Sequence, residues 1–275
     1  MKQEKSDSAL PVMAAPYEPP QESGIRPEMI ILSWFAPLTW LGKGFQDMLR
    51  HPWIAGFYGV SFMLMAQFLG YVFRRAPEYM LTMISGCLLV GPFMAMGLYE
   101  VSRRSEQGEA CDLSDSLTCW DSHIRSMAML ILVLMVLELL WGRASLVVFA
   151  VFFNTGMPST TGVVDAIFNP ENLEFILVYL SIGGVFAALV YALAVVSIPM
   201  ILDRDTDAIS AAITSVAVVY ANPMVMLLWG ALICLLIALA LWPGAVGLML
   251  VGPWLGHASW HAYRDSVGWP DALAS

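Results

Sequence analysis

The chain has 275 residues, of which 59% are hydrophobic and only 13% are charged, and its formal net charge is −9. An ordinary soluble domain carries about 25% charged residues and cannot bury this much apolar surface. The composition therefore excludes a soluble globular protein and predicts an integral membrane protein. Without a block of Lys and Arg residues, the sequence also argues against nucleic-acid binding.

The N-terminal 28 residues are polar and Pro-rich, and they lack the apolar core of a signal peptide. We therefore predict a disordered cytoplasmic tail over 1–28. A membrane domain is expected over 29–267, and a short C-terminal tail over 268–275.

Apolar runs of roughly 18 or more residues mark helices that span a membrane. Six such runs lie at about 53–73, 79–99, 127–147, 175–198, 224–241 and 245–262. With six spans, ten of the 13 Lys and Arg residues fall on the side that carries both termini. The excess of positive charge on cytoplasmic loops then predicts that both termini are cytoplasmic. The predicted fold is an all-α bundle of six transmembrane helices.

Mixed polar and apolar segments precede the odd-numbered runs and predict amphipathic helices in the membrane interface. They cover 30–52, 114–126 and 207–223. The even-numbered runs each contain a proline or are followed directly by one, and they end in clustered charges; the prolines are Pro92, Pro199 and Pro253. This order predicts a threefold internal repeat, in which an interfacial helix is followed by a hairpin of two spans.

The charged segment at the end of the last apolar run is HASWHAYRDS at 257–266. It places His257 and His261 on one face of a helix. Such a pair can bind haem or a metal, with His51, His123 or Cys119 as further ligands on the same side. Histidine also suits the membrane boundary, because its apolar body and polar tip match the headgroup region. We predict boundary histidines and no cofactor, with haem or metal binding as the alternative.

The charged segment that follows the fourth apolar run, LDRDTD at 202–207, has four charges in its last five residues. One reading is an ion-binding or gating site; the other is a solvated loop in which Arg204 pairs with its Asp neighbours and Asp207 caps the next helix. The candidate functional cluster at the cytoplasmic face comprises Asp203, Arg204, Asp205, His257, His261 and Arg264.

Glu138 and Arg143 interrupt the third apolar run, in VLELLWGRASL. A charge inside the hydrocarbon layer costs several kcal/mol unless it is paired, so it suggests a function. Arg143 follows Trp141 and is expected at the membrane edge. Glu138 is therefore the candidate intramembrane acid, of the kind that a proton-coupled transporter uses.

Catalytic motifs are missing: the sequence has no Walker loop, no GxGxxG, no HExxH, no CxxC and no serine nucleophile elbow. This argues against an enzyme and leaves three functions. The first is a non-enzymatic accessory or assembly partner of a membrane complex, in contact with lipid and other inner-membrane proteins. The second is a small-solute or proton-coupled transporter, and the third is a haem or metal protein.

The stretches VVSIPMILDRDTDAISAAITSV and LVGPWLGHASWHAYRDS resemble a proteobacterial family of predicted integral membrane proteins, domain of unknown function 2189. The resemblance covers about 30–267 and implies a six-span protein of the bacterial inner membrane with no assigned role. Some relatives are labelled as cytochrome c oxidase subunits, but a haem-copper oxidase core needs more metal-ligating histidines than the four in this chain.

Overall fold

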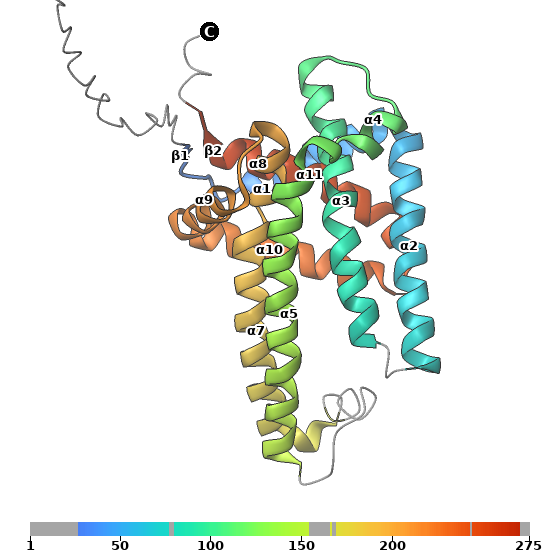
Figure 1. Ribbon diagram of the computed structural model, residues 1–275, viewed down its shortest axis with the longest axis vertical. Helices are drawn as coiled ribbons and strands as arrows, with labels where there is room; N and C mark the ends of the chain where they lie inside the picture. Colours follow the sequence, from blue (N-terminus) through green and yellow to red (C-terminus); the bar gives the residue numbers. More distant parts are fainter. Residues whose placement is uncertain (1–26, 77–79, 154–165, 167–168, 243, 270–275) are drawn as a thin grey trace, which may run out of the picture.

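The computed structural model describes residues 27–76, 80–153, 166, 169–242 and 244–269, and the predicted tails lie almost wholly outside them. The described chain is almost entirely helical (Figure 1). The helices are α1 (Ala36–Arg50), α2 (Pro52–Arg75), α3 (Met80–Gln107), α4 (Leu113–Thr118), α5 (Ile124–Phe152), α7 (Leu173–Ala194), α8 (Ser197–Arg204), α9 (Ala208–Ala221), α10 (Pro223–Ala240) and α11 (Leu248–Ser266), with 3-10 helices η2 (Asp121–His123) and η3 (Pro170–Asn172). Strands β1 (Glu28–Met29) and β2 (Val267–Gly268) pair antiparallel.

Local sequence explains where several helices begin. α2 begins with Pro52 and α10 with Pro223, because proline has no N–H and its fixed φ suits a first helical turn. The predicted cap of α9 is confirmed. The Asp207 carboxylate accepts hydrogen bonds from the N–H groups of Ile209 and Ser210 at 2.9 and 3.0 Å.

Within the part of the chain that the structure describes, four helical stretches are long and apolar enough to cross a membrane. They are Pro52–Arg75, Leu113–Phe152, Pro170–Arg204 and Pro223–Ala240. They correspond to the first, third, fourth and fifth predicted runs and confirm these four by length and composition. The chain is therefore an integral membrane protein whose apolar helices contact lipid.

The other two predicted spans, 79–99 and 245–262, form helices but are not among these four stretches. α3 begins directly after residues that lie outside the described part of the chain. α11 is apolar only in its first half, and it packs against α1, α2, α3 and α10, passing behind α3 and α5 in Figure 1. The count of six spans is not confirmed.

The order of the helices agrees with the predicted repeat. A shorter helix precedes two longer ones three times: α1 before α2 and α3, α4 before α5 and α7, and α9 before α10 and α11. The two longer helices of each set contact each other. The three amphipathic segments are thus confirmed as helices, whereas the threefold repeat itself stays a prediction.

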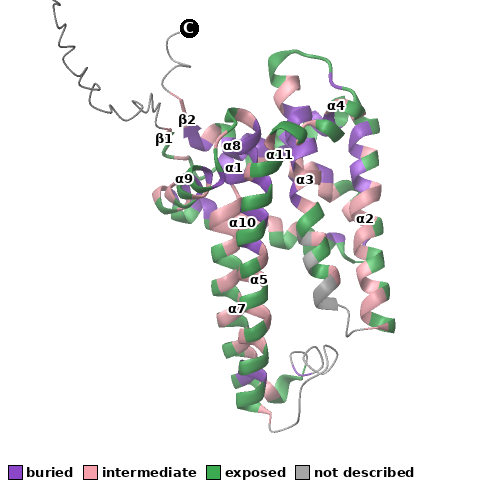
Figure 2. Ribbon diagram, in the orientation of Figure 1, coloured by how far each residue is buried: buried purple, intermediate pink, exposed green. Residues whose placement is uncertain are grey.

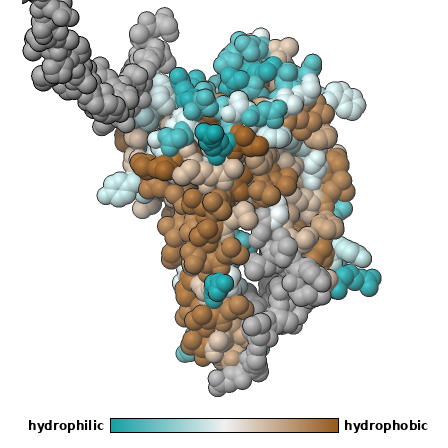
Figure 3. Space-filling view, in the orientation of Figure 1, coloured by the Kyte–Doolittle hydropathy of each residue, from teal (hydrophilic) through white to brown (hydrophobic). Residues whose placement is uncertain are grey.

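The buried core lies at one end of the long helices, where α1, α3, α8 and α11 meet (Figure 2). Trp40 and Trp229 are fully buried there, and their rings meet edge to face with centroids 5.4 Å apart. α5 and α7 continue beyond this core as a pair (Figure 1). Figure 3 shows that the surface is hydrophilic at the core end and hydrophobic along α5 and α7. We name the hydrophilic end, formed by α1, α4, α8 and the C-terminal turns of α3 and α11, the polar end.

Two glycines let α11 approach its neighbours closely. A Cβ at Gly44 of α1 would lie 2.5 Å from the backbone nitrogen of Ala258. A Cβ at Gly59 of α2 would overlap the carbonyl of Met249. Because backbone atoms cannot move aside as a flexible side chain can, only glycine permits this approach, and it fixes the position of α11 at the polar end.

Candidate functional site

Three polar side chains of α11 face the same part of the polar end. His257, His261 and Arg264 follow at spacings of four and three residues, which places them on one helix face. α1, α3 and α8 all contact α11. The groups that meet this face therefore come from segments far apart in the sequence.

His261 lies between carboxylates from two different helices. Its Nε2 is 2.9 Å from Asp47 Oδ2 of α1, and its Nδ1 is 3.3 Å from Glu106 Oε1 of α3, an ion-pair distance with poor hydrogen-bond alignment. The side chains of His261 and Asp47 are 6% and 4% exposed. Burial opposes the charged imidazole, but Asp47 and Glu106 outweigh it and raise the pKa of His261 above its ordinary 6.5.

The same contacts favour the ionised forms of the two acids. Burial opposes ionisation of Asp47, yet hydrogen bonds with His261 and Ser102 lower its pKa below the ordinary 3.8. Burial also opposes ionisation of Glu106, and contacts with His261 and Arg264 lower its pKa. We call these three residues, Asp47, His261 and Glu106, the histidine triad.

His257 lies one turn before His261 and is fully buried. Its Nδ1 is 2.8 Å from Ser102 Oγ of α3, and burial lowers the pKa of His257 to about 4, so the ring is neutral near pH 7. A serine–histidine contact of this length is typical of a nucleophile and its base. However, Ser102 and His257 are both 0% exposed, so no substrate reaches them. We interpret the pair as structural.

Arg264 connects the histidine triad to α8. Its Nε is 3.2 Å from Glu106 Oε2, and its Nη1 is 3.7 Å from Asp203 Oδ2. Asp203 also accepts a hydrogen bond from the Tyr263 hydroxyl at 2.7 Å and lies 3.2 Å from Arg204 Nε. Polar contacts thus join α1, α3, α8 and α11 in one network.

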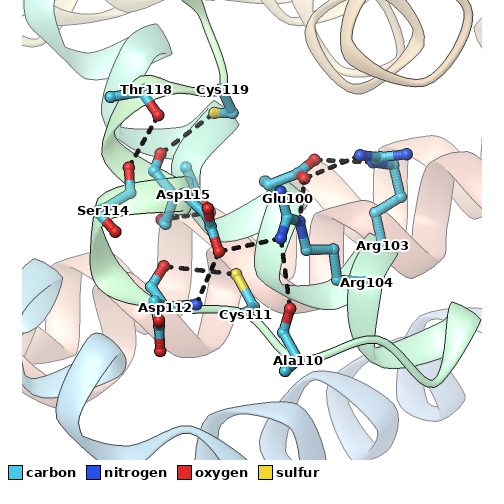
Figure 4. Close-up of polar contacts among 12 residues, drawn as sticks. Glu100, Arg103, Arg104, Ala110, Cys111, Asp112, Ser114, Asp115, Thr118 and Cys119 are labelled. Atoms are coloured by element: carbon cyan, nitrogen blue, oxygen red, sulfur yellow. Dashed lines mark hydrogen bonds and ion pairs between the residues drawn. The ribbon is translucent and has the colours of Figure 1, made fainter.

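A second cluster lies on the last turns of α3 (Figure 4). The buried Glu100 carboxylate accepts two hydrogen bonds from Arg103, at 2.7 and 2.8 Å, and one from Arg104 at 2.7 Å. Arg104 also donates to Asp115 of α4 at 3.0 Å. Burial opposes ionisation of Glu100, but the two arginines lower its pKa. This arginine clamp, formed by Glu100, Arg103 and Arg104, holds two guanidinium groups in fixed positions.

A cavity of about 480 Å³ opens beside the arginine clamp, and we call it the polar-end pocket. Its walls come from α3, α4 and η2, with Leu202 of α8, and they include charges of both signs. Cys119 also lines it, but burial raises the pKa of this thiol to about 12, so it is not a reactive thiolate. The volume suits a small ligand or a few side chains of a partner protein.

The structure brings most of the predicted cluster together. Asp203, Arg204, His261 and Arg264 belong to the polar network described above, and His257 approaches it through Ser102. Asp205 is separate, because its carboxylate is 80% exposed and its Oδ1 is 3.0 Å from His123 Nδ1. The local pairing of Arg204 with Asp203 is confirmed, and the Arg204 guanidinium also lies 4.5 Å from the centre of the Trp269 ring. A functional role for the cluster stays a prediction.

The four histidines do not gather at one point. His51 lies between α1 and α2, and His123 at the start of α5, whereas both ring nitrogens of His261 already face carboxylates. Among the described residues, no group of three His, Cys, Asp or Glu side chains is arranged to hold a metal ion. Haem or metal binding by His51, His123, His257 or His261 stays a prediction.

Glu138 lies in the stretch Leu113–Phe152, which is suited to span a membrane, and its side chain is half-buried. Arg143, five residues later on α5, is exposed. α5 continues past Arg143 to Phe152, so the helix does not end beside Trp141, and the position of Arg143 at the membrane edge stays a prediction. The role of Glu138 as an intramembrane acid stays a prediction.

The sequence interpretation missed the partners that α1 and α3 supply. For Asp47 a signal exists in the sequence. Ala36, Trp40, Gly44 and Asp47 recur at spacings of four and three, so the carboxylate falls on the apolar face of α1. An acid on such a face needs a buried partner. No comparable signal distinguishes Glu106 from the other charges that follow the second apolar run.

No curated protein and no solved structure matches the chain. A family model covers residues 80–203, which include every residue that lines the polar-end pocket but neither Asp47 nor α11. The match is shorter than the resemblance expected over about 30–267. Residues 80–203 match the family described as predicted integral membrane protein (DUF2189), the family that the sequence motifs indicated.

Proposed function

We propose that the chain is a non-enzymatic accessory or assembly protein of the bacterial inner membrane, and that it binds a partner protein at its polar end. The polar-end pocket carries this proposal. Glu100 fixes Arg103 and Arg104 before any partner arrives, so binding would immobilise few further side chains and cost little entropy. A rigid polar pocket next to membrane helices suits the attachment of a neighbouring membrane protein.

Site-specific photo-crosslinking tests this proposal. A photoreactive amino acid replaces Ser122, which lines the pocket, or Tyr220, which is 87% exposed on α9 and outside the pocket. We expect one protein to be crosslinked reproducibly from position 122 and not from position 220. Glu100→Gln should weaken this crosslink, because it loosens both arginines. Equal crosslinking from both positions, or none from position 122, would contradict the proposal.

A proton-coupled transporter is the second candidate, favoured by the buried Asp47 and His261 of the histidine triad together with Glu138. Proteoliposomes that contain a pH-sensitive dye would report proton entry when a candidate solute is added. Glu138→Gln should abolish this signal, and Glu171→Gln, at an exposed position, should preserve it. A signal that survives Glu138→Gln would exclude the proposed role of this acid.

Haem or metal binding is the remaining candidate. An absorption spectrum of the purified protein, oxidised and then reduced with dithionite, tests for haem. A Soret band that shifts on reduction and disappears in His261→Ala would support it. A featureless visible spectrum would rule out haem.

A further inference from the structure

The histidine triad joins three helices at one side chain. Asp47 lies on α1, Glu106 on α3 and His261 on α11. The two acids, Asp47 and Glu106, are 59 positions apart in the sequence. We propose that His261 is a reversible proton-binding site that locks α1 and α3 onto α11 when its imidazole is charged. This inference does not depend on the proposed partner or on the polar-end pocket.

The geometry favours an N–H on both ring nitrogens. A charged imidazole carries both, so it can donate a hydrogen bond to Asp47 from Nε2 and form an ion pair with Glu106 at Nδ1 at the same time. A neutral imidazole has one N–H and one lone pair. Its lone pair would then face a carboxylate at 2.9 or 3.3 Å, which is repulsive. Loss of the proton therefore breaks one arm of the bridge.

Burial decides which arm breaks. The Asp47 side chain is 4% exposed and has little water to replace a lost hydrogen bond, whereas Glu106 is 34% exposed. The neutral ring should therefore keep its N–H on Asp47 and release Glu106. The same exposure makes Glu106 the route by which a proton enters and leaves, since it alone of the triad reaches solvent.

The surrounding charges leave His261 as the cation at the centre. On α1, Arg50 Nη1 is 3.4 Å from Asp47 Oδ1, and His51 follows α1. On α11, His257 is neutral near pH 7 and Arg264 contacts the outer oxygen of Glu106. On α8, Asp203 contacts Arg264. After proton loss, Arg264 still holds Glu106 from the solvent side, but α1 is no longer bridged to α3.

Hydrogen–deuterium exchange of the purified full chain tests the lock. Exchange of α1 and of the last turns of α3 is measured between pH 5.5 and 8.5, and each value is divided by that of α5 in the same sample. This ratio removes the intrinsic pH dependence of exchange. We expect the ratio to rise with pH, because loss of the proton from His261 removes the bridge between α1 and α3. A ratio that is constant over this range in the wild-type protein overturns the proposal.

Matched variants assign the effect to His261. His261→Gln should give a ratio independent of pH. Glu106→Gln should move the midpoint to lower pH, because one of the two stabilising charges is lost. His123→Gln removes the other histidine–aspartate contact of the polar end and should leave the wild-type curve unchanged. If His123→Gln abolishes the pH dependence of the ratio and Glu106→Gln does not change it, the assignment to His261 is overturned. The wild-type measurement tests the proposal even where a variant does not fold.

Discussion

At the residue scale, burial rather than distance separates the two histidine–aspartate contacts of the polar end. His261 and Asp47 are 2.9 Å apart and nearly inaccessible to water, whereas His123 and Asp205 are 3.0 Å apart with an Asp205 side chain that is 80% exposed. Removing one partner of a buried pair leaves the other charge without compensation, while an exposed charge regains water. The two contacts should therefore differ strongly in their effect on stability.

Asp47→Ala should lower the free energy of unfolding by about 3–5 kcal/mol, because it leaves His261 and Ser102 without their shared partner. Asp205→Asn is the control: it removes the charge, keeps a residue suited to the left-handed backbone at this position (φ 49°), and should cost less than about 1 kcal/mol. Denaturant unfolding of the purified protein in detergent, followed by tryptophan fluorescence, measures both. Equal losses for the two variants would show that burial is not the deciding factor.

At the element scale, the glycines of α1 differ in what surrounds them. Gly44 faces the backbone of Ala258 in α11, whereas no atom lies within 4 Å of a Cβ placed at Gly42. The same substitution two residues apart therefore separates helix packing from helix propensity.

Gly44→Ala should destabilise the protein by about 1–3 kcal/mol, the usual cost of inserting a methyl group where the neighbouring backbone must shift. Gly42→Ala should leave the stability unchanged or raise it by about 0.5–1 kcal/mol, because alanine favours a helix over glycine. Thermal unfolding of the two variants checks this difference. A destabilising Gly42→Ala would mean that the exposed face of α1 has a contact beyond the described residues.

The helices themselves could be predicted, because runs of apolar residues and the prolines that begin α2 and α10 are local features of the sequence. What surrounds each helix could not be predicted from these local features. The apolar first half of α11 has the composition of a span, and composition does not state whether lipid or protein lies beside it. The histidine triad had the same limit, since Asp47 and His261 are 214 residues apart in the chain.

At the scale of the whole molecule, the ionisable groups of the polar end predict how stability depends on pH. The raised pKa of His261 contributes stability that is full below its unfolded value of 6.5 and is lost as pH rises through the folded value. The lowered pKa values of Asp47 and Glu106 contribute stability that is present above their unfolded values and is lost as pH falls. The two trends meet in mildly acidic solution.

Burial lowers the pKa of His257 to about 4, which adds stability that is present above its unfolded value of 6.5 and is lost as pH falls. The unfolding temperature should therefore be highest at roughly pH 6.5 and fall on both sides. Differential scanning fluorimetry between pH 3 and 9 measures this curve. In His261→Gln the fall on the alkaline side should flatten while the fall on the acidic side remains. An alkaline fall of the same size in this variant would assign it to another group.

The predicted orientation of α3 rests on a whole-molecule property, the distribution of basic residues. Single cysteines at Arg75 and at Glu109, in a chain whose four native cysteines are replaced by alanine, lie before and after α3. If α3 crosses the membrane as predicted, a maleimide that cannot cross membranes should label position 75 in intact cells and position 109 only after permeabilisation. Labelling of both positions under the same condition would show that α3 does not cross.

The pairing of β1 with β2 limits how many times the chain between them can cross the membrane. Met29 and Val267 are opposite each other in the small sheet, so they lie on the same side of the membrane. A chain that leaves and returns to one side crosses an even number of times. The four confirmed stretches already make an even number. A crossing by α3 without α11, or by α11 without α3, would break this parity, so the six-span prediction requires both helices to cross.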